Sequence, residues 1–146
     1  MLRGRELALV AVLLAACGSV GAPGPGASPT ASVSERVVPF RDVGATANSG
    51  HDDDAPRIDA VRAGSGLRIT AYQGGQRSGG YAIQIERITR VGNELRVQAR
   101  FTEPAPGSFN TMALTSPAHT VSVDETADVV VLYDARGVER ARARTN

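Results

Sequence analysis

Side chains that could carry out catalysis are few in this chain of 146 residues. A serine or threonine nucleophile needs a nearby base, and His51 and His119 are the only histidines. His51 lies in a polar stretch rich in turn-forming residues, and His119 follows shortly after Pro117. The Gly-x-Ser-x-Gly pattern of an exposed serine nucleophile does not occur in the sequence. We therefore predict that the protein is not an enzyme.

Two motifs contain the residue types of a ligand site without the required spacing. The run His51-Asp52-Asp53-Asp54, with Asp59 nearby, lacks the alternating ligands, central glycine and distal glutamate of a calcium loop. The glycine-rich stretch at 74–80 connects two expected strands and lacks the Lys-Ser or Lys-Thr ending of a phosphate-binding loop. We expect a solvated acidic loop in the first case and a turn with positive φ angles in the second. No metal and no cofactor are expected.

The composition argues against several other functions. All sixteen basic residues are arginine, so neither Schiff-base chemistry nor the lysine of a P-loop is available. There is no tryptophan, and three tyrosines and three phenylalanines are too few for a platform that stacks single-stranded nucleic acid. Without residues 1–16 the chain has 14 arginines and 14 acidic residues, so it has no broad field that would attract nucleic acid. A binding or structural module remains, and we expect no nucleic-acid partner.

The first seventeen residues have the pattern of an export signal. Arg3 and Arg5 precede an apolar run at 7–14, which is too short for a membrane-spanning helix. The run ends in Leu14-Ala15-Ala16-Cys17, which resembles the lipobox of bacterial lipoproteins. The resemblance implies cleavage before Cys17 and a lipid such as palmitate on its thiol, which would anchor the protein to a bacterial plasma or outer membrane outside the cytoplasm. An ordinary secretory signal with a cysteine near its cleavage site is the alternative.

Composition divides the chain that follows this predicted signal peptide (1–16) into three parts. Residues 17–32 are rich in Gly, Pro, Ala and Ser, which predicts a lipid-anchored flexible tether. Residues 33–65 contain an irregular stretch and a short apolar segment at 37–40, which we expect to be an edge strand because Pro39 cannot donate to a central ladder. Residues 66–146 remain as the folded β domain.

Apolar and polar residues alternate from residue 67 onward, with the period of a half-buried β-strand. The pattern predicts strands at 67–72, 81–85 and 94–102, with a bulge near 86–87 and a turn at 92–93. Further strands are expected at 119–123 and 129–133, followed by a turn at 134–137 and a last strand or frayed tail. The inward positions that we expect to be buried are Ile83, Ile85, Leu95, Val97 and Phe101.

Outside the export signal, no window shows the 3.6-residue apolar stripe of an amphipathic helix. The chain is therefore predicted to be all-β, a small antiparallel sandwich or partly open barrel of about five to seven strands.

Four short blocks in the second half of the chain occur in a recognisable order. They are SGGYAIQI at 78–85, LRV at 95–97, EPAPG at 103–107 and ALTSP at 113–117. Together they resemble the PrcB C-terminal domain over about residues 66–134. The family is named for a lipoprotein subunit of a surface protease complex, so the resemblance implies a role in the assembly or stability of a secreted serine protease.

We therefore predict a lipid-anchored accessory protein of the cell envelope, a non-catalytic subunit that binds and stabilises a secreted or surface protein such as a protease. Partner contacts are expected on the loops at 76–80 and 103–115, since binding residues concentrate on loops held by a rigid scaffold. An arginine suits bidentate hydrogen bonds, and an aromatic side chain among polar neighbours suits an interface. The candidate partner-binding residues are Arg77, Ser78, Gly79, Gly80, Tyr81 and Phe109.

Alternatives to this prediction stay open. The protein could be a protease-inhibitor-like or ligand-binding β-sandwich, because Gly80-Tyr81 after a loop is similar to the Thr-Gly-Tyr loop of chagasin-type cysteine protease inhibitors. It could also be a structural spacer of the envelope. At the level of residues, Tyr81 and Phe109 could pack on the core instead of contacting a partner.

Overall fold

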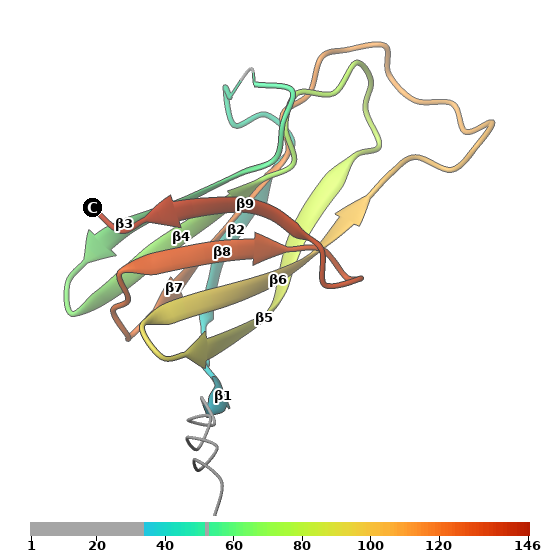
Figure 1. Ribbon diagram of the computed structural model, residues 1–146. Helices are drawn as coiled ribbons and strands as arrows, with labels where there is room; N and C mark the ends of the chain where they lie inside the picture. Colours follow the sequence, from blue (N-terminus) through green and yellow to red (C-terminus); the bar gives the residue numbers. More distant parts are fainter. Residues whose placement is uncertain (1–33, 52) are drawn as a thin grey trace, which may run out of the picture. The chain divides into compact units, whose positions relative to one another are not determined.

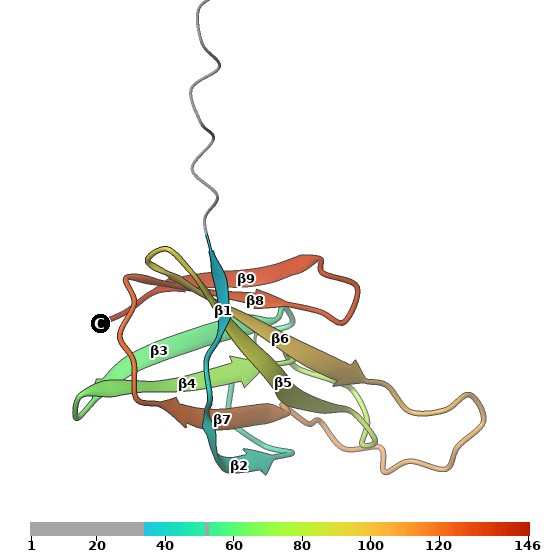
Figure 2. The ribbon, with the colours of Figure 1, turned by 90° about the horizontal axis from the view of Figure 1, so that it is seen from below.

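Two β-sheets packed face to face make up the computed structural model, which describes residues 34–51 and 53–146 (Figures 1 and 2). The predicted signal peptide, Cys17 and the predicted tether lie outside the described residues. In the part that is described there is no helix, and hence no helix long and apolar enough to cross a membrane.

The larger sheet contains five strands in the order β1-β5-β6-β8-β9. Neighbouring strands are antiparallel except β6 and β8, which run parallel because the chain passes through β7 of the other sheet between them. The strands are β1 (Glu35–Val37), β5 (Ala82–Val91), β6 (Glu94–Thr102), β8 (Val129–Tyr133) and β9 (Glu139–Arg144).

The smaller sheet contains four antiparallel strands in the order β2-β7-β4-β3. The strands are β2 (Arg41–Thr46), β3 (Arg57–Ala63), β4 (Gly66–Tyr72) and β7 (Ala118–Val123). The predicted all-β sandwich is confirmed, although the described residues form nine strands rather than five to seven. The additional strands come from 35–63, where β2 is exposed along its whole length and therefore shows no alternation of apolar and polar residues.

The segment at 37–40, predicted to be an edge strand, instead carries the chain from one sheet to the other. β1 ends at Val37 and β2 begins at Arg41. Between them Val38 is buried in the core, and Phe40 packs against it. Pro39 has no N–H to donate, so the crossing leaves no ladder hydrogen bond unmade at this residue.

The core lies between the two sheets and is built from the alternating positions of the strands. The inward residues of β5 and β6 are buried as predicted at Ile83, Ile85, Leu95 and Val97. The prediction of a buried Phe101 was wrong, because this side chain is only half-buried at the edge of the core. It lies near the end of β6, where the Arg140 guanidinium covers its ring at 5.1 Å from the ring centre.

Local features of the strands agree with the sequence. The register between β5 and β6 shifts between Ile85 and Arg87, which confirms the predicted bulge. The tight turn between these strands has Gly92 at a φ of 60°. The turn at 134–137 closes with a hydrogen bond of 2.9 Å from the Gly137 N–H to the Asp134 carbonyl.

Hydrogen bonds at two places join the sheets. At one edge, the N–H of Asn146 donates to the carbonyl of Ala60 on β3 at 3.4 Å, beyond the end of β9. Between the inner strands β7 and β5, the buried ring of His119 accepts the N–H of Ile85 at Nδ1, over 2.9 Å. His119 is thereby engaged in holding the sandwich together.

Candidate functional site

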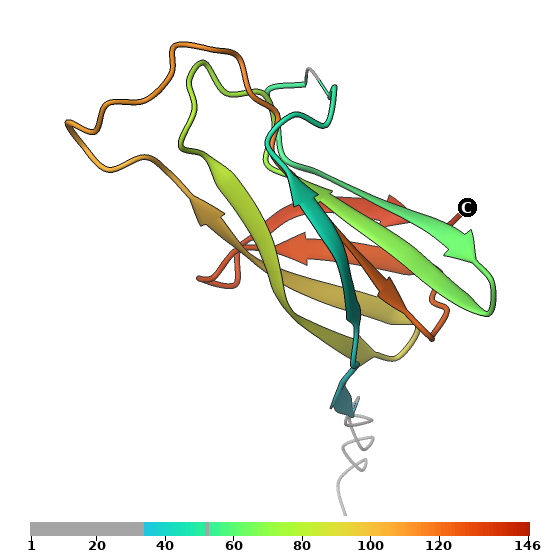
Figure 3. The same ribbon diagram turned by 180° about the vertical axis from the view of Figure 1, so that it is seen from behind.

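The two loops predicted to contact a partner lie against each other at one end of the sandwich (Figures 1 and 3). They are the β4–β5 loop, residues 73–81, and the β6–β7 loop, residues 103–117. Gln76 and Thr115 exchange two backbone hydrogen bonds of 2.7 and 2.9 Å. The N–H of Gly79 donates to the carbonyl of Thr111 at 2.9 Å, and the Thr115 hydroxyl donates to the carbonyl of Ser78 at 2.9 Å. The two loops therefore form one structure.

A third loop, residues 47–56 between β2 and β3, completes this region, which we call the loop end. Its Ser49 N–H donates to the carbonyl of Ser116 at 2.9 Å. Gly74 has a φ of +93°, and a Cβ at this residue would lie 2.6 Å from the Asp54 carbonyl oxygen. The glycine-rich stretch therefore does use positive φ, as predicted, and it allows two backbones to approach closely.

Three of the predicted residues, Ser78, Gly79 and Gly80, hold the loops together. The Ser78 carbonyl accepts the hydrogen bond described above, and a Cβ on Gly79 would lie 3.0 Å from the Thr111 hydroxyl oxygen. Gly80 has a φ of +88°, and a Cβ there would lie 2.6 Å from the Asn110 side-chain oxygen. In the described structure these residues therefore connect the two loops of the loop end to each other and allow them to approach closely.

The other predicted residues lie on different sides of the loop end. Arg77 is exposed and lines a hollow of about 460 Å³ between the β4–β5 loop and the 47–56 loop. Tyr81 is half-buried and lines a second hollow, of about 270 Å³, on the side of Phe101. Phe109 is fully exposed near the tip of the β6–β7 loop and does not fold back onto the core.

The β6–β7 loop exposes an apolar surface that sequence reasoning identified only in part. Phe109 is 106% exposed, Met112 91% and Leu114 80%, whereas the other exposed large apolar residues of the described chain are valines near 54%. Residues 104–117 contain no charged side chain. Three large apolar residues in an uncharged loop without strand periodicity were the signal that could have revealed Met112 and Leu114.

His51, in the 47–56 loop, packs against the ring of Tyr72 with ring centres 4.9 Å apart. Its Nε2 lies 3.1 Å from a carboxylate oxygen of Asp53. The pKa of the Tyr72 phenol is raised, mainly because the ring is partly buried and secondly because the negative charge of Asp59 lies nearby. Within the described residues, neither the His51 nor the His119 ring has a hydroxyl side chain as a hydrogen-bond partner. No three His, Cys, Asp or Glu side chains of that part of the chain gather where they could hold a metal ion.

Gln73 lines the 270 Å³ hollow and was not predicted. Its Nε2 donates to the carbonyl of Thr102 at 3.1 Å, which links the β4–β5 loop to the end of β6. Its Oε1 is buried with no hydrogen-bond partner among the described residues, at a cost of about 1–3 kcal/mol. A glutamine that follows a strand gives no sequence signal of burial.

A comparison with protein families matches the part of the chain that contains two of the three loops of the loop end. Residues 68–124 match the family model described as PrcB C-terminal. The match extends from β4 through β7 and includes both the β4–β5 and the β6–β7 loop. It confirms the predicted PrcB C-terminal resemblance. No curated protein and no solved structure matches the chain.

Proposed function

We propose that the chain is a non-catalytic accessory subunit of the bacterial cell envelope. Lipid on Cys17 would hold it at a membrane, and the β domain would bind and stabilise a secreted or surface protein such as a protease. The family match supports this proposal, because it suggests a subunit associated with a protease complex. The Leu14-Ala15-Ala16-Cys17 sequence at the end of the export signal supports the lipid anchor.

The observation that carries the proposal is the exposed apolar surface of Phe109, Met112 and Leu114. Three large apolar side chains exposed to solvent within six residues of one loop are typical of an interaction site. Burial of each against a partner would contribute about 1.5–3 kcal/mol before the costs of association. Backbone hydrogen bonds from Thr111 and Thr115 to the β4–β5 loop hold the segment that contains Met112 and Leu114 in place, which lowers the entropy lost on binding. The exposed Arg77 is available beside it for a hydrogen-bonded contact.

The position of the surface in the domain suits a tethered subunit. β1, where the described chain begins, pairs with the end of β5 at Val91, whereas the β4–β5 loop joins β5 at Ala82. β5 has ten residues, which at about 3.3 Å per residue separates these points by about 30 Å. The loop end therefore lies at the far end of the domain from the point where the chain enters it (Figure 1).

Affinity capture tests the proposed binding surface. We expect Phe109→Ser combined with Leu114→Ser to reduce capture of the partner from the native envelope at least tenfold, while leaving the melting temperature unchanged. Val61→Ser, at an exposed apolar residue of β3 outside the loop end, is the control and should retain capture. Undiminished capture by the folded double variant would contradict the assignment of the surface.

Two further measurements separate the proposed subunit from its alternatives. A captured protease should remain active, and survive longer, with an equimolar amount of the chain; loss of its activity would instead identify an inhibitor. Membrane fractionation tests the anchor, since Cys17→Ser should release the protein from the membrane fraction and remove the mass of the lipid. A protein that stays in the membrane fraction with unchanged mass would contradict lipidation at Cys17.

A further inference from the structure

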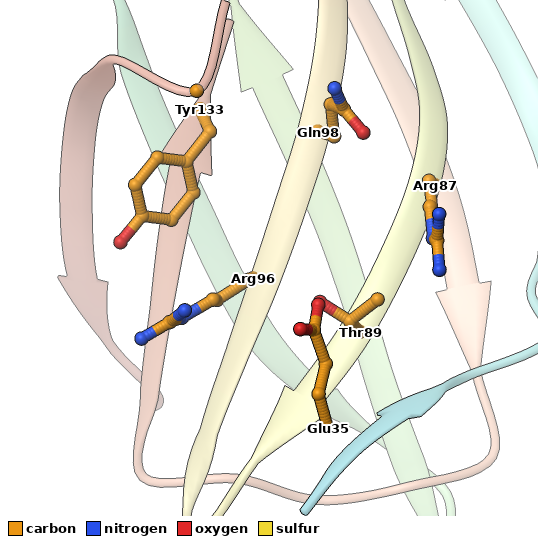
Figure 4. A pocket seen from close by; sticks show the side chains of 7 residues that line it. Glu35, Arg87, Thr89, Arg96, Gln98 and Tyr133 are labelled. Carbon is orange, nitrogen blue, oxygen red and sulfur yellow. The ribbon is translucent and has the colours of Figure 1, made fainter. Parts of the chain in front are cut away.

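The outer face of the five-stranded sheet contains a hollow of about 250 Å³ (Figure 4). We call it the sheet-face site. Its side chains come from four strands, and groups fixed on strands are more precisely placed than groups on loops. The polar residues that line it are Glu35, Arg87, Thr89, Arg96, Gln98 and Tyr133.

The strand register arranges five of these residues in two rows, and Glu35, which pairs with Val91, lies in a third row. Gln98 on β6 pairs with Arg87 on β5 and with Tyr133 on β8, so that one row crosses three strands. Arg96 pairs with Thr89 in the next row. Neighbouring strands lie about 4.8 Å apart, so the three-strand row extends about 10 Å, and the two rows are about 7 Å apart. The site therefore has the dimensions of a short oligosaccharide.

Arg96 is already engaged and gives the site a fixed wall. Its Nε donates to a carboxylate oxygen of Glu94 at 3.1 Å, and this hydrogen bond raises the pKa of Arg96. Its guanidinium lies 5.9 Å from the centre of the Tyr133 ring, which holds the ring in orientation.

The remaining lining groups form no side-chain hydrogen bond with the described residues and differ in their bonding capacity. The carboxylate of Glu35 only accepts hydrogen bonds, and the guanidinium of Arg87 only donates them. The hydroxyls of Thr89 and Tyr133 and the amide of Gln98 both donate and accept. An anion would need donors alone, and a cation would need acceptors alone.

We propose that the sheet-face site binds a saccharide. Each hydroxyl of a sugar both donates and accepts a hydrogen bond, so a polyhydroxylated ligand uses the whole mixed set of groups. The partly exposed ring of Tyr133 suits the apolar C–H face of a sugar ring. The inference is independent of the proposed function, because none of these residues belongs to the loop end.

Titration of the full chain with defined probes tests the inference. The probes are chitotetraose, maltotetraose and cellotetraose, with inorganic phosphate and tetralysine as charged controls. Binding is followed by shifts of ¹⁵N amide resonances and by tyrosine fluorescence, which is readable because the chain has no tryptophan. We expect at least one oligosaccharide to shift resonances of β5, β6 and β8, and neither charged probe to do so.

Two glutamines on the same sheet face provide a matched pair of variants. Gln98→Ala removes an amide from the site and should weaken oligosaccharide binding about two- to tenfold, the loss expected for one neutral hydrogen-bonding group. Gln84→Ala removes the same group from an exposed position of β5 outside the site and should leave binding unchanged. Tyr133→Phe, which removes only a hydroxyl, should also weaken binding and serves if the Gln98 variant does not fold.

Three results would overturn the assignment. The first is that no oligosaccharide shifts the resonances at millimolar concentration. The second is that phosphate or tetralysine binds as tightly as the sugars. The third is that Gln84→Ala weakens binding as much as Gln98→Ala.

Discussion

The hydrogen bond between the two sheets at His119 offers a sharp test of what holds this domain together. The imidazole is 3% exposed, and its Nδ1 accepts the N–H of Ile85 at 2.9 Å. Its Nε2 bonds to a carboxylate oxygen of Asp42 at 3.1 Å. The substitution His119→Phe keeps a ring of similar size, so it removes both hydrogen bonds without leaving a large cavity.

The expected loss of stability follows from the burial of each partner. The Ile85 N–H belongs to a buried residue and would be left without an acceptor, which costs about 1–3 kcal/mol. The Asp42 side chain is 63% exposed, so water replaces its partner and the loss is below about 1 kcal/mol. We expect His119→Phe to lower the free energy of unfolding by about 2–3 kcal/mol. For a domain of this size that corresponds to a fall of about 10 °C in Tm.

Thermal and urea unfolding of the full chain measure this loss, and amide hydrogen exchange locates it at the Ile85 N–H. Asp42→Asn is the matched control, because it changes only the exposed end of the same link and should lower Tm by a few degrees at most. A His119→Phe protein with wild-type Tm and unchanged exchange at Ile85 would refute the reasoning. A loss in Asp42→Asn as large as in His119→Phe would refute it as well.

Three further predictions concern the charge network, the core and a glycine. Hydrogen bonds from Arg36 lower the pKa of Glu125 below its ordinary value of 4.5, so the stability that they contribute is complete above that value and is lost as the pH falls through the lowered pKa. The free energy of unfolding of Glu125→Gln should therefore depend less on pH than that of wild type between about pH 5 and 3. Equal pH dependence in the two proteins would contradict this. Leu95→Ala should lower the free energy of unfolding in urea by about 3–4 kcal/mol and Phe101→Ala by only about 2 kcal/mol, because Leu95 is fully buried and Phe101 is not. A larger loss in Phe101→Ala than in Leu95→Ala would be inconsistent with the core described above. Gly66→Ala should destabilise the domain by about 3 kcal/mol in the same assay, since a Cβ at this residue would overlap the backbone of β7. A variant of wild-type stability would contradict this and show that β7 can move aside.

Most of the predictions that rest on neighbouring residues agree with the structure, and Phe101 is the exception among the expected inward positions. A half-buried strand repeats every two residues, so the inward positions of β5 and β6 could be read from the chain at Ile83, Ile85, Leu95 and Val97. The break in that alternation located the bulge at Ile85–Arg87, where the register shifts. These features depend on local sterics and local burial, and both are encoded within a few residues.

The first strands of the domain could not be predicted in the same way. β2 is exposed over all six of its residues, so no alternation distinguishes it from a loop. It becomes a strand because its backbone pairs with β7, which lies more than 70 residues further along the chain. A strand defined by its hydrogen-bonding neighbour leaves little trace in its own composition.

The candidate sites also combine features that neighbouring residues encode with features that depend on distant segments of the chain. The sequence by itself determined which loops lack strand periodicity and which of them contain Arg77 and Phe109. Only the tertiary structure decided that the β4–β5 and β6–β7 loops form hydrogen bonds with each other. It also decided that Phe109, Met112 and Leu114 are exposed to solvent. The strand register, which brings Arg87, Gln98 and Tyr133 into one row, is likewise a property of the folded sheet. These arrangements depend on pairing between distant segments, and pairing is decided by the burial of the whole core rather than by the residues of any one loop.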